Sequence, residues 1–150
     1  MKVEKIMTKN VGTCSTGENL GKAVFIMWQK DCGVVPVLDA DEKVIGMITD
    51  RDVCIALTSR NQRASEVLVN DLTHGNLISC SPKDSVKSVL RTMAKHKIKR
   101  LPVTGKKGNL KGIISIADIL RLKKKKSLRK SLAKTLEEIS KPASIVLKQI

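Results

Sequence analysis

Aromatic residues are almost absent from this 150-residue sequence, which contains one Phe (Phe25), one Trp (Trp28) and no Tyr. A hydrophobic core must therefore be built from aliphatic side chains and methionine. Apolar residues make up 41% of the chain, which is enough for such a core. Aromatic platforms for stacking nucleic-acid bases are equally scarce, so the sequence does not indicate specific base recognition.

Long hydrophobic runs are also missing, since no apolar stretch approaches the roughly 20 residues of a membrane span. The opening Met1-Lys2-Val3-Glu4 does not begin a secretion signal. The sequence therefore predicts a soluble, cytoplasmic protein.

The four cysteines have no CxxC spacing and no histidine close in sequence, so the usual zinc sites are excluded and no metal is expected. They are predicted to be small buried apolar residues in a reducing compartment. These are Cys14, Cys32, Cys54 and Cys80.

Acidic residues are scarce in the second half of the chain. Residues 1–78 contain 9 Lys/Arg and 10 Asp/Glu, a net charge of −1. Residues 79–120 contain 10 and 2, and residues 121–150 contain 10 and 2, so each has a net charge of +8. A field of this kind attracts polyanions such as nucleotide phosphates, nucleic acid or anionic lipid.

An internal repeat organises the chain. Shifting the sequence by 66 residues aligns Cys14-Ser15 with Cys80-Ser81 and Pro36-Val37 with Pro102-Val103, without a gap. Apolar positions keep the same phase over about 40 residues. The matched glycines, isoleucines and aspartates are Gly46/Gly112, Ile48/Ile114 and Asp52/Asp118.

Each repeat is predicted to be a strand–helix–strand–strand–helix unit, so the expected fold class is α/β (α+β). In the first, strands are expected near 11–14, 34–38 and 43–48, with helices over 18–30 and from 50. In the second, a strand is expected over 76–80, a helix starting at Ser81-Pro82, strands over 99–103 and 110–115, and a helix from 117.

Neither repeat is large enough to bury its own sheet, so the two are expected to pack face to face with pseudo-twofold symmetry. The predicted organisation is residues 1–60 for the first repeat, 61–122 for the second and 123–150 for a basic helical extension.

Two corners between a strand and a helix share the form Gly-apolar-apolar-Thr/Ser-x-x-Asp. They are residues 46–52 and 112–118, preceded by Val35-Pro36-Val37 and Leu101-Pro102-Val103. With these motifs the chain, over residues 3–122, resembles a tandem pair of CBS domains, the Bateman module named after cystathionine β-synthase. The resemblance implies a regulatory module that binds AMP, ADP, ATP or another adenosyl compound such as S-adenosylmethionine, requires no cofactor and forms homodimers.

The corner chemistry suits a nucleotide. A helix amino terminus offers unpaired N–H groups and a positive dipole end to a phosphate. A carboxylate three residues after the hydroxyl can accept hydrogen bonds from a ribose diol. The resemblance implies that Asp52 and Asp118 bind ribose and that Thr49 and Ser115 contact phosphate or ribose, in two separate clefts.

The resemblance also suggests which side chains bind phosphate and base. Arg100, with Lys99 beside it, is expected to clamp phosphate in the Ser115/Asp118 cleft, because its counterpart in the first repeat is Val34. Arg51 is the substitute in the Thr49/Asp52 cleft. The expected neighbours of adenine are Met47, Ile113, Cys32, Gly33 and Ile98.

Each assignment has a structural alternative. The alternatives are that Asp52 and Asp118 are early-helix residues, that Thr49 and Ser115 are helix caps, and that Arg100 is a solvated charge. An enzyme is not expected, because no nucleophile with a base and no metal cluster accompanies the motifs.

The tail contains an apolar stripe at helical spacing among lysines and arginines, and Pro142 is expected to end this helix. Ala143 to Leu147 form a short apolar run. Three roles are open for the helix: a dimer interface, a nucleic-acid contact through its cations, or attachment to an anionic membrane. The alternative function is therefore a nucleic-acid-associated protein with the CBS pair as its dimerisation scaffold. The stripe is Leu128, Leu132, Leu136 and Ile139.

Overall fold

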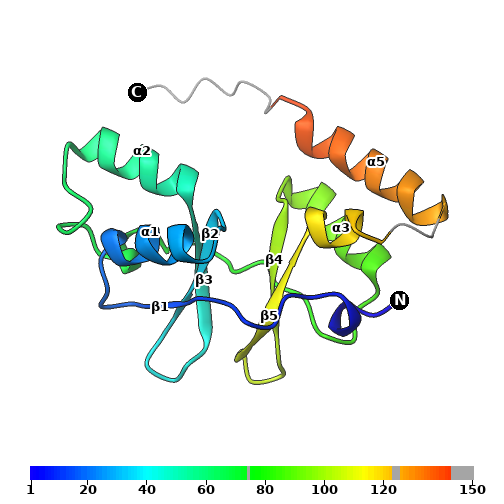
Figure 1. Ribbon diagram of the computed structural model, residues 1–150, viewed down its shortest axis with the longest axis horizontal. Coiled ribbons are helices and arrows are strands. Elements are labelled where there is room, and N and C mark those ends of the chain that lie inside the picture. The colour runs from blue at the N-terminus through cyan, green and yellow to red at the C-terminus, as the bar shows by residue number, and fades with distance from the viewer. Residues whose placement is uncertain (74, 123–125, 143–150) are drawn as a thin grey trace.

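A computed structural model describes residues 1–73, 75–122 and 126–142. The molecule has two halves side by side, each with a small sheet and helices above it (Figure 1). The first half contains β1 (Cys14–Ser15), α1 (Leu20–Gln29), β2 (Val34–Leu38), β3 (Val44–Thr49) and α2 (Asp50–Arg60). The second contains α3 (Val86–His96), β4 (Arg100–Thr104), β5 (Leu110–Ser115) and α4 (Ile116–Leu120). The fold is mixed α/β with two repeats, as expected.

The two hairpins match in detail. β2 pairs antiparallel with β3, and Val34 lies opposite Thr49; β4 pairs antiparallel with β5, and Arg100 lies opposite Ser115. Both ladders shift register at the same place, after Val37 in one and Val103 in the other. The 66-residue repeat in sequence is thus a repeat in backbone geometry.

The start of the second repeat differs from the expectation. β1 adds a third, parallel strand to the first sheet, whereas the strand expected over 76–80 is a single bridge between Cys80 and Val103. α3 begins at Val86 with Ser85 as its cap, and not at Ser81-Pro82. The reason is a turn in which the carboxylate of Asp84 accepts the backbone N–H of Ser81 at 2.9 Å. The helix starts only after this turn closes.

The hydrophobic core of each half includes residues from outside its own repeat. Val3, in the 3-10 helix η1 (Val3–Lys5), is fully buried in the core of the second half. Val67 and Val69, before and within η2 (Val69–Leu72), are buried in the core of the first half. Figure 1 shows the amino-terminal segment crossing from one half to the other. This exchange ties the halves together, while the boundaries 1–60 and 61–122 stay a prediction.

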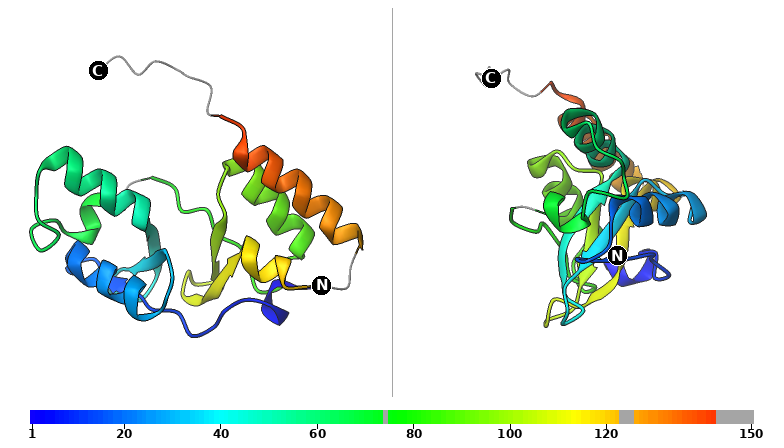
Figure 2. Two further views of the ribbon diagram at one scale, coloured as in Figure 1. Left: turned by 45° about the horizontal axis from the view of Figure 1, so that its top comes forward. Right: turned by 90° about the vertical axis from the view of Figure 1, so that its left-hand side faces the viewer.

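The tail helix α5 (Lys126–Ser140) packs along α3 in the same chain (Figure 2). Leu128 and Leu132 are buried in the second core, and Leu136 and Ile139 pack against it. The Thr135 hydroxyl donates to the backbone oxygen of Leu90 at 3.3 Å. These contacts use the apolar stripe within the same chain, because an amphipathic helix buries its stripe wherever an apolar face is nearest. A role of the helix in a dimer interface stays a prediction.

The rest of the tail agrees in part with the sequence. α5 ends at Ser140, two residues before Pro142, as expected. The apolar run over Ala143–Leu147 lies outside the described residues. Lys130 and Lys134 are exposed, and nucleic-acid binding through the basic tail stays a prediction.

We expect Leu132→Ala to lower the free energy of unfolding by about 2–4 kcal/mol, because it opens a cavity between α5 and α3. Leu132 is 5% exposed. Urea denaturation measures the change, with Lys130→Ala, on the exposed side of the same helix, as the control. Equal stability of the two variants would contradict the docked position of α5.

Candidate functional site

The two corners carry identical hydrogen-bonded boxes. The Thr49 hydroxyl donates to Asp52 Oδ2 at 2.7 Å and accepts the Asp52 N–H at 3.2 Å. In the second repeat the Ser115 hydroxyl donates to Asp118 Oδ2 at 2.6 Å and accepts the Asp118 N–H at 3.2 Å. The helix-cap interpretation of Thr49 and Ser115 is therefore confirmed, and each box fixes the position of its carboxylate.

The two aspartates differ at Oδ1, the carboxylate oxygen that takes no part in the capping box. Asp118 Oδ1 accepts a hydrogen bond from Arg121 at 3.1 Å, and the Asp118 side chain is only 9% exposed. Asp52 is exposed, and no described residue donates a hydrogen bond to its Oδ1. Only the first corner thus presents a carboxylate oxygen that is open to a ligand.

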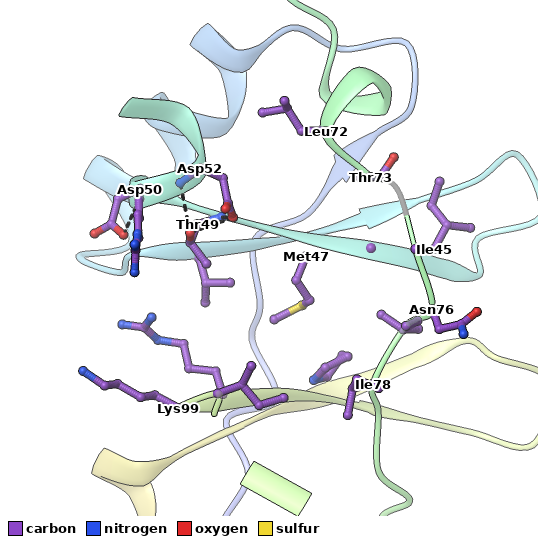
Figure 3. A pocket seen from close by; sticks show the side chains of 18 of the residues that line it. Ile45, Met47, Thr49, Asp50, Asp52, Leu72, Thr73, Asn76, Ile78 and Lys99 are labelled. Atoms are coloured by element: carbon purple, nitrogen blue, oxygen red, sulfur yellow. Dashed lines mark hydrogen bonds between the residues drawn. The ribbon is translucent and has the colours of Figure 1, made fainter. Parts of the chain in front are cut away.

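Asp52 lies in a cleft of about 570 Å³ between the two halves, a volume in the range of small-molecule sites. One wall comes from β3 and the start of α2, with Met47, Thr49 and Asp52. The opposite wall comes from the loop before β4, with Lys99, and from the segment around Asn76 and Ile78. Figure 3 shows Met47 pointing between the walls, with Asp52 and Lys99 on opposite sides of the same end.

The cleft is apolar at one end and charged at the other. The apolar lining contains Ile45, Met47, Leu72 and Ile78. The charged end contains Asp50 and Asp52 from one repeat and a row of cations from the other. These cations are Lys97, Lys99 and Arg100, with Arg51 beside the carboxylates.

The row of cations has no counterpart in the first repeat. Sixty-six residues earlier, the positions of Lys97, Lys99 and Arg100 are held by Asp31, Gly33 and Val34. A cleft at the second corner built from those positions would lack all three positive charges. The electrostatic preference for an anion therefore belongs to the Thr49/Asp52 cleft.

Arg100 lies in a different cleft from the one expected. It is the ladder partner of Ser115, but its side chain lines the cleft of Thr49 and Asp52. The cause is the face-to-face packing, which sets the loop before β4 against the corner of the other repeat. A Cβ atom on Gly33 would lie 3.5 Å from Arg100 Nη2 and 2.7 Å from Asp50 Oδ2, so the missing side chain leaves room for both groups.

Seven of the predicted site residues gather in this cleft and five lie elsewhere. Cys32 and Gly33 line a groove between α1 and α2, next to Trp28. Ile113 is buried and its backbone pairs with Thr8, while Ser115 and Asp118 form the other corner. The seven in the cleft are Met47, Thr49, Arg51, Asp52, Ile98, Lys99 and Arg100.

Other lining residues were not expected from the sequence. Lys97 was missed although it is two residues from Lys99, because the repeat aligns it with Asp31 and suggests no shared role. Leu72 and Thr73 were missed because they belong to the connection between repeats. Thr73 passes directly over Gly46, where an added Cβ would lie 2.7 Å from its side chain.

The cysteines divide into two buried and two exposed thiols. Burial, and then the charge of Glu18, raises the pKa of Cys14 to about 11. Burial, and then the charge of Asp84, raises the pKa of Cys80 to about 12. Cys32 and Cys54 are exposed, so the prediction of four buried cysteines was wrong for these two.

We expect iodoacetamide at pH 8 to label Cys32 and Cys54 and to spare Cys14 and Cys80, because only the thiolate reacts and the buried pair stays protonated. Mass spectrometry of tryptic peptides locates the labels. In denaturant all four should react. Labelling of Cys14 in the native protein would contradict its burial.

Comparison with known proteins places the chain in a family. The family model described as "CBS domain" matches residues 3–59 and again residues 69–125. The chain belongs to the CBS domain family. The two matches correspond to the two halves in Figure 1.

Similar CBS proteins share most of the chain. The CBS domain-containing protein YhcV of Bacillus subtilis is 32% identical over 117 residues, which cover 78% of this chain and 81% of YhcV. The CBS domain pair of protein MJ0100, solved in complex with 5′-methylthioadenosine and S-adenosyl-L-methionine, has a TM-score of 0.71 and 25% identity and covers 81% of this chain and 94% of its own. A hexameric CBS-CP12 protein from bloom-forming cyanobacteria has a TM-score of 0.72 and 27% identity, covering 83% and 72%.

The part of the CBS pair that the structure describes contains neither a candidate metal site nor a helix that could span a membrane. In it, no three His, Cys, Asp or Glu side chains come together as a group that could hold a metal ion. Within those same ranges, no helix combines the length and the apolar character needed to cross a membrane.

Proposed function

We propose that this CBS pair is a regulatory module that binds one adenosyl ligand, preferably an adenine nucleotide, in the cleft between β3 and β4. The observation that carries the proposal is the open carboxylate edge of Asp52 opposite Lys99 and Arg100, at the charged end of an apolar cleft. The complex of the MJ0100 pair with two adenosyl compounds supports the ligand class.

The cleft orients such a ligand by its chemistry. Adenine packs against Met47 and Ile78, which line the apolar end. The ribose hydroxyls donate to Asp52, whose Oδ2 is already held by Thr49. The phosphates lie at Lys99 and Arg100, where charge-assisted hydrogen bonds form.

The proposed role is binding and not catalysis. A ligand that contacts both walls favours the arrangement in which the halves are close together, and this shifts the population of conformers. The result passes to a partner protein, and the proposed location is the cytoplasm, where adenine nucleotides are abundant.

We also propose that the module forms a homodimer through α1. Trp28 is 77% exposed and Phe25 is 50% exposed, with their ring centroids 6.0 Å apart. Trp28 also borders the groove between α1 and α2, which has a volume of about 550 Å³. One surface thus offers both a projecting indole and a groove beside it, which makes it suited to self-complementary contact across a twofold axis. The hexameric CBS-CP12 relative supports self-association.

The dimer has a direct test. Light scattering after size exclusion is expected to give twice the chain mass for the wild type and the chain mass for Trp28→Glu, because the charge cannot be buried in the interface. Gln29→Glu places the same charge on the next residue of α1 and should leave the dimer intact. Equal masses for all three proteins would contradict the interface.

The proposed ligand class is tested by calorimetric titration of the full chain with adenosine, AMP, ADP, ATP, S-adenosylmethionine and 5′-methylthioadenosine. We expect saturable binding with one site per chain, tightest for a phosphate-bearing nucleotide. GMP is the control for the base. No heat from any adenosyl compound would overturn the proposal.

A further inference from the structure

Lys97 contacts two separate parts of the molecule, the cleft and the end of α5. It lines the cleft beside Lys99 and Arg100. Its Nζ also donates hydrogen bonds to the backbone oxygens of Lys141 at 3.2 Å and Pro142 at 3.3 Å. These oxygens lie just past the carboxyl end of α5, so one lysine connects the wall of the cleft with the end of the tail helix.

The end of α5 is a negative environment for this ammonium group. The last carbonyl oxygens of a helix have no partners within it and form the negative end of its dipole. The Glu138 carboxylate lies in the same turn, where the hydrogen bond from Lys141 lowers its pKa and the charge of Lys97 adds to the effect. Lys97 is thus held at α5 by acceptors that a ligand phosphate can replace.

The backbone conformation of Lys97 is also unusual. It ends α3 in the left-handed conformation, with φ of 53°, where glycine is normally preferred. This conformation directs the chain back toward β4, so that the lysines at 97 and 99 both reach the same cleft.

We propose that Lys97 couples ligand binding to the tail: a phosphate bound at Lys99 and Arg100 attracts Lys97 away from Lys141 and Pro142, and the last turn of α5 is released. The inference rests on the proposed function and adds its output element. A ligand without phosphate occupies the apolar end and Asp52 but leaves Lys97 at α5. Release would free the last turn of α5 to bind a partner, with reciprocal effects on affinity.

Hydrogen exchange on the full chain tests the coupling. We expect saturating ATP to speed exchange of the Lys141 amide, which donates to Glu137 at 3.1 Å, by about threefold or more, the factor for losing a hydrogen bond of ordinary net strength. Saturating adenosine should leave its rate unchanged. Amides in the middle of α5 should be unaffected by either ligand.

Two variants of the full chain separate Lys97 from other lysines. Lys97→Met should give fast exchange at Lys141 without ligand and no further change with ATP, whereas Lys97→Arg should behave as the wild type. Lys95→Met, an exposed lysine of α3, is the matched control for charge.

The outcomes are distinct. If ATP binds by calorimetry but the exchange rate at Lys141 does not change, or changes equally with adenosine, the coupling is overturned and the proposed function survives. If neither ATP nor adenosine binds, the coupling is overturned, and the proposed function is overturned as well when no other adenosyl compound binds. Because Lys97→Met is also measured without ligand, the contact between Lys97 and the end of α5 is tested independently of any nucleotide.

Discussion

Asp52→Ala is expected to weaken binding of AMP by at least about tenfold, equivalent to 1.4 kcal/mol, because the ribose diol loses its charged acceptor. Asp52 Oδ1 has no donor among the described residues, so it is available to the two hydroxyls. Calorimetry measures the loss. Because the same carboxylate closes the capping box of α2, the variant also loses about 0.5–2 kcal/mol of stability.

The second repeat provides the matched control. Asp118→Ala removes an identical capping box and should cost similar stability, yet it should change AMP affinity less than about twofold, since Asp118 already pairs with Arg121. A larger loss from Asp118→Ala than from Asp52→Ala would contradict the assignment of the cleft. The sequence alone suggested that larger loss from Asp118→Ala, because it placed Arg100 in the Ser115/Asp118 cleft.

Arg100→Ala is expected to weaken ATP binding by at least about tenfold and adenosine binding by less than about twofold. Arginine contributes bidentate, charge-assisted hydrogen bonds to phosphate, and adenosine has no phosphate to lose. Adding Lys99→Ala should deepen the loss for ATP alone. Higher ionic strength should weaken ATP more than adenosine for the same reason.

The control for Arg100 is Arg91→Ala, which removes one positive charge from the exposed face of α3. It should leave both affinities near those of the wild type. Equal losses of ATP and adenosine in Arg100→Ala would mean that Arg100 shapes the cleft and does not bind phosphate.

Local pattern was sufficient for the repeats and their corners. Alternation and the proline in the first strand of each hairpin predicted β2, β3, β4 and β5 to within a residue or two, because strand periodicity depends on neighbours in the chain. The Thr49/Asp52 and Ser115/Asp118 boxes were predicted as motifs for the same reason. Both were offered as ligand-binding residues with helix capping as the alternative, and the structure shows the capping.

Packing between the halves was not predictable from the repeat. The 66-residue offset compares Arg100 with Val34 and Lys97 with Asp31, but it does not say which corner either side chain faces. That depends on how two sheets meet, with segments such as Val3 crossing from one half to the other. The pattern therefore named seven residues that line the candidate cleft, and it expected Arg100 beside Asp118, whereas Arg100 lines the cleft of Asp52.

The tail shows the same limit. The spacing of Leu128, Leu132, Leu136 and Ile139 predicted a helix with one apolar face. It could not identify the surface that covers this face, because a stripe fits α3 of its own chain as well as a second copy. Apolar side chains stay exposed on α1, where Phe25 and Trp28 lie, and Ile55, Leu68 and Leu120 are exposed elsewhere.

The methionines provide the most direct measurement of the central claim. Met47 lines the cleft, Met7 lies against Gly112 at the other corner, and Met27 and Met93 are buried in the two cores. In a chain with ¹³C-methyl methionine, titration with AMP should shift the Met47 methyl resonance to saturation, with little change at Met7, Met27 and Met93. A shift confined to Met7, or equal saturating shifts at Met7 and Met47, would contradict a single ligand in the Thr49/Asp52 cleft.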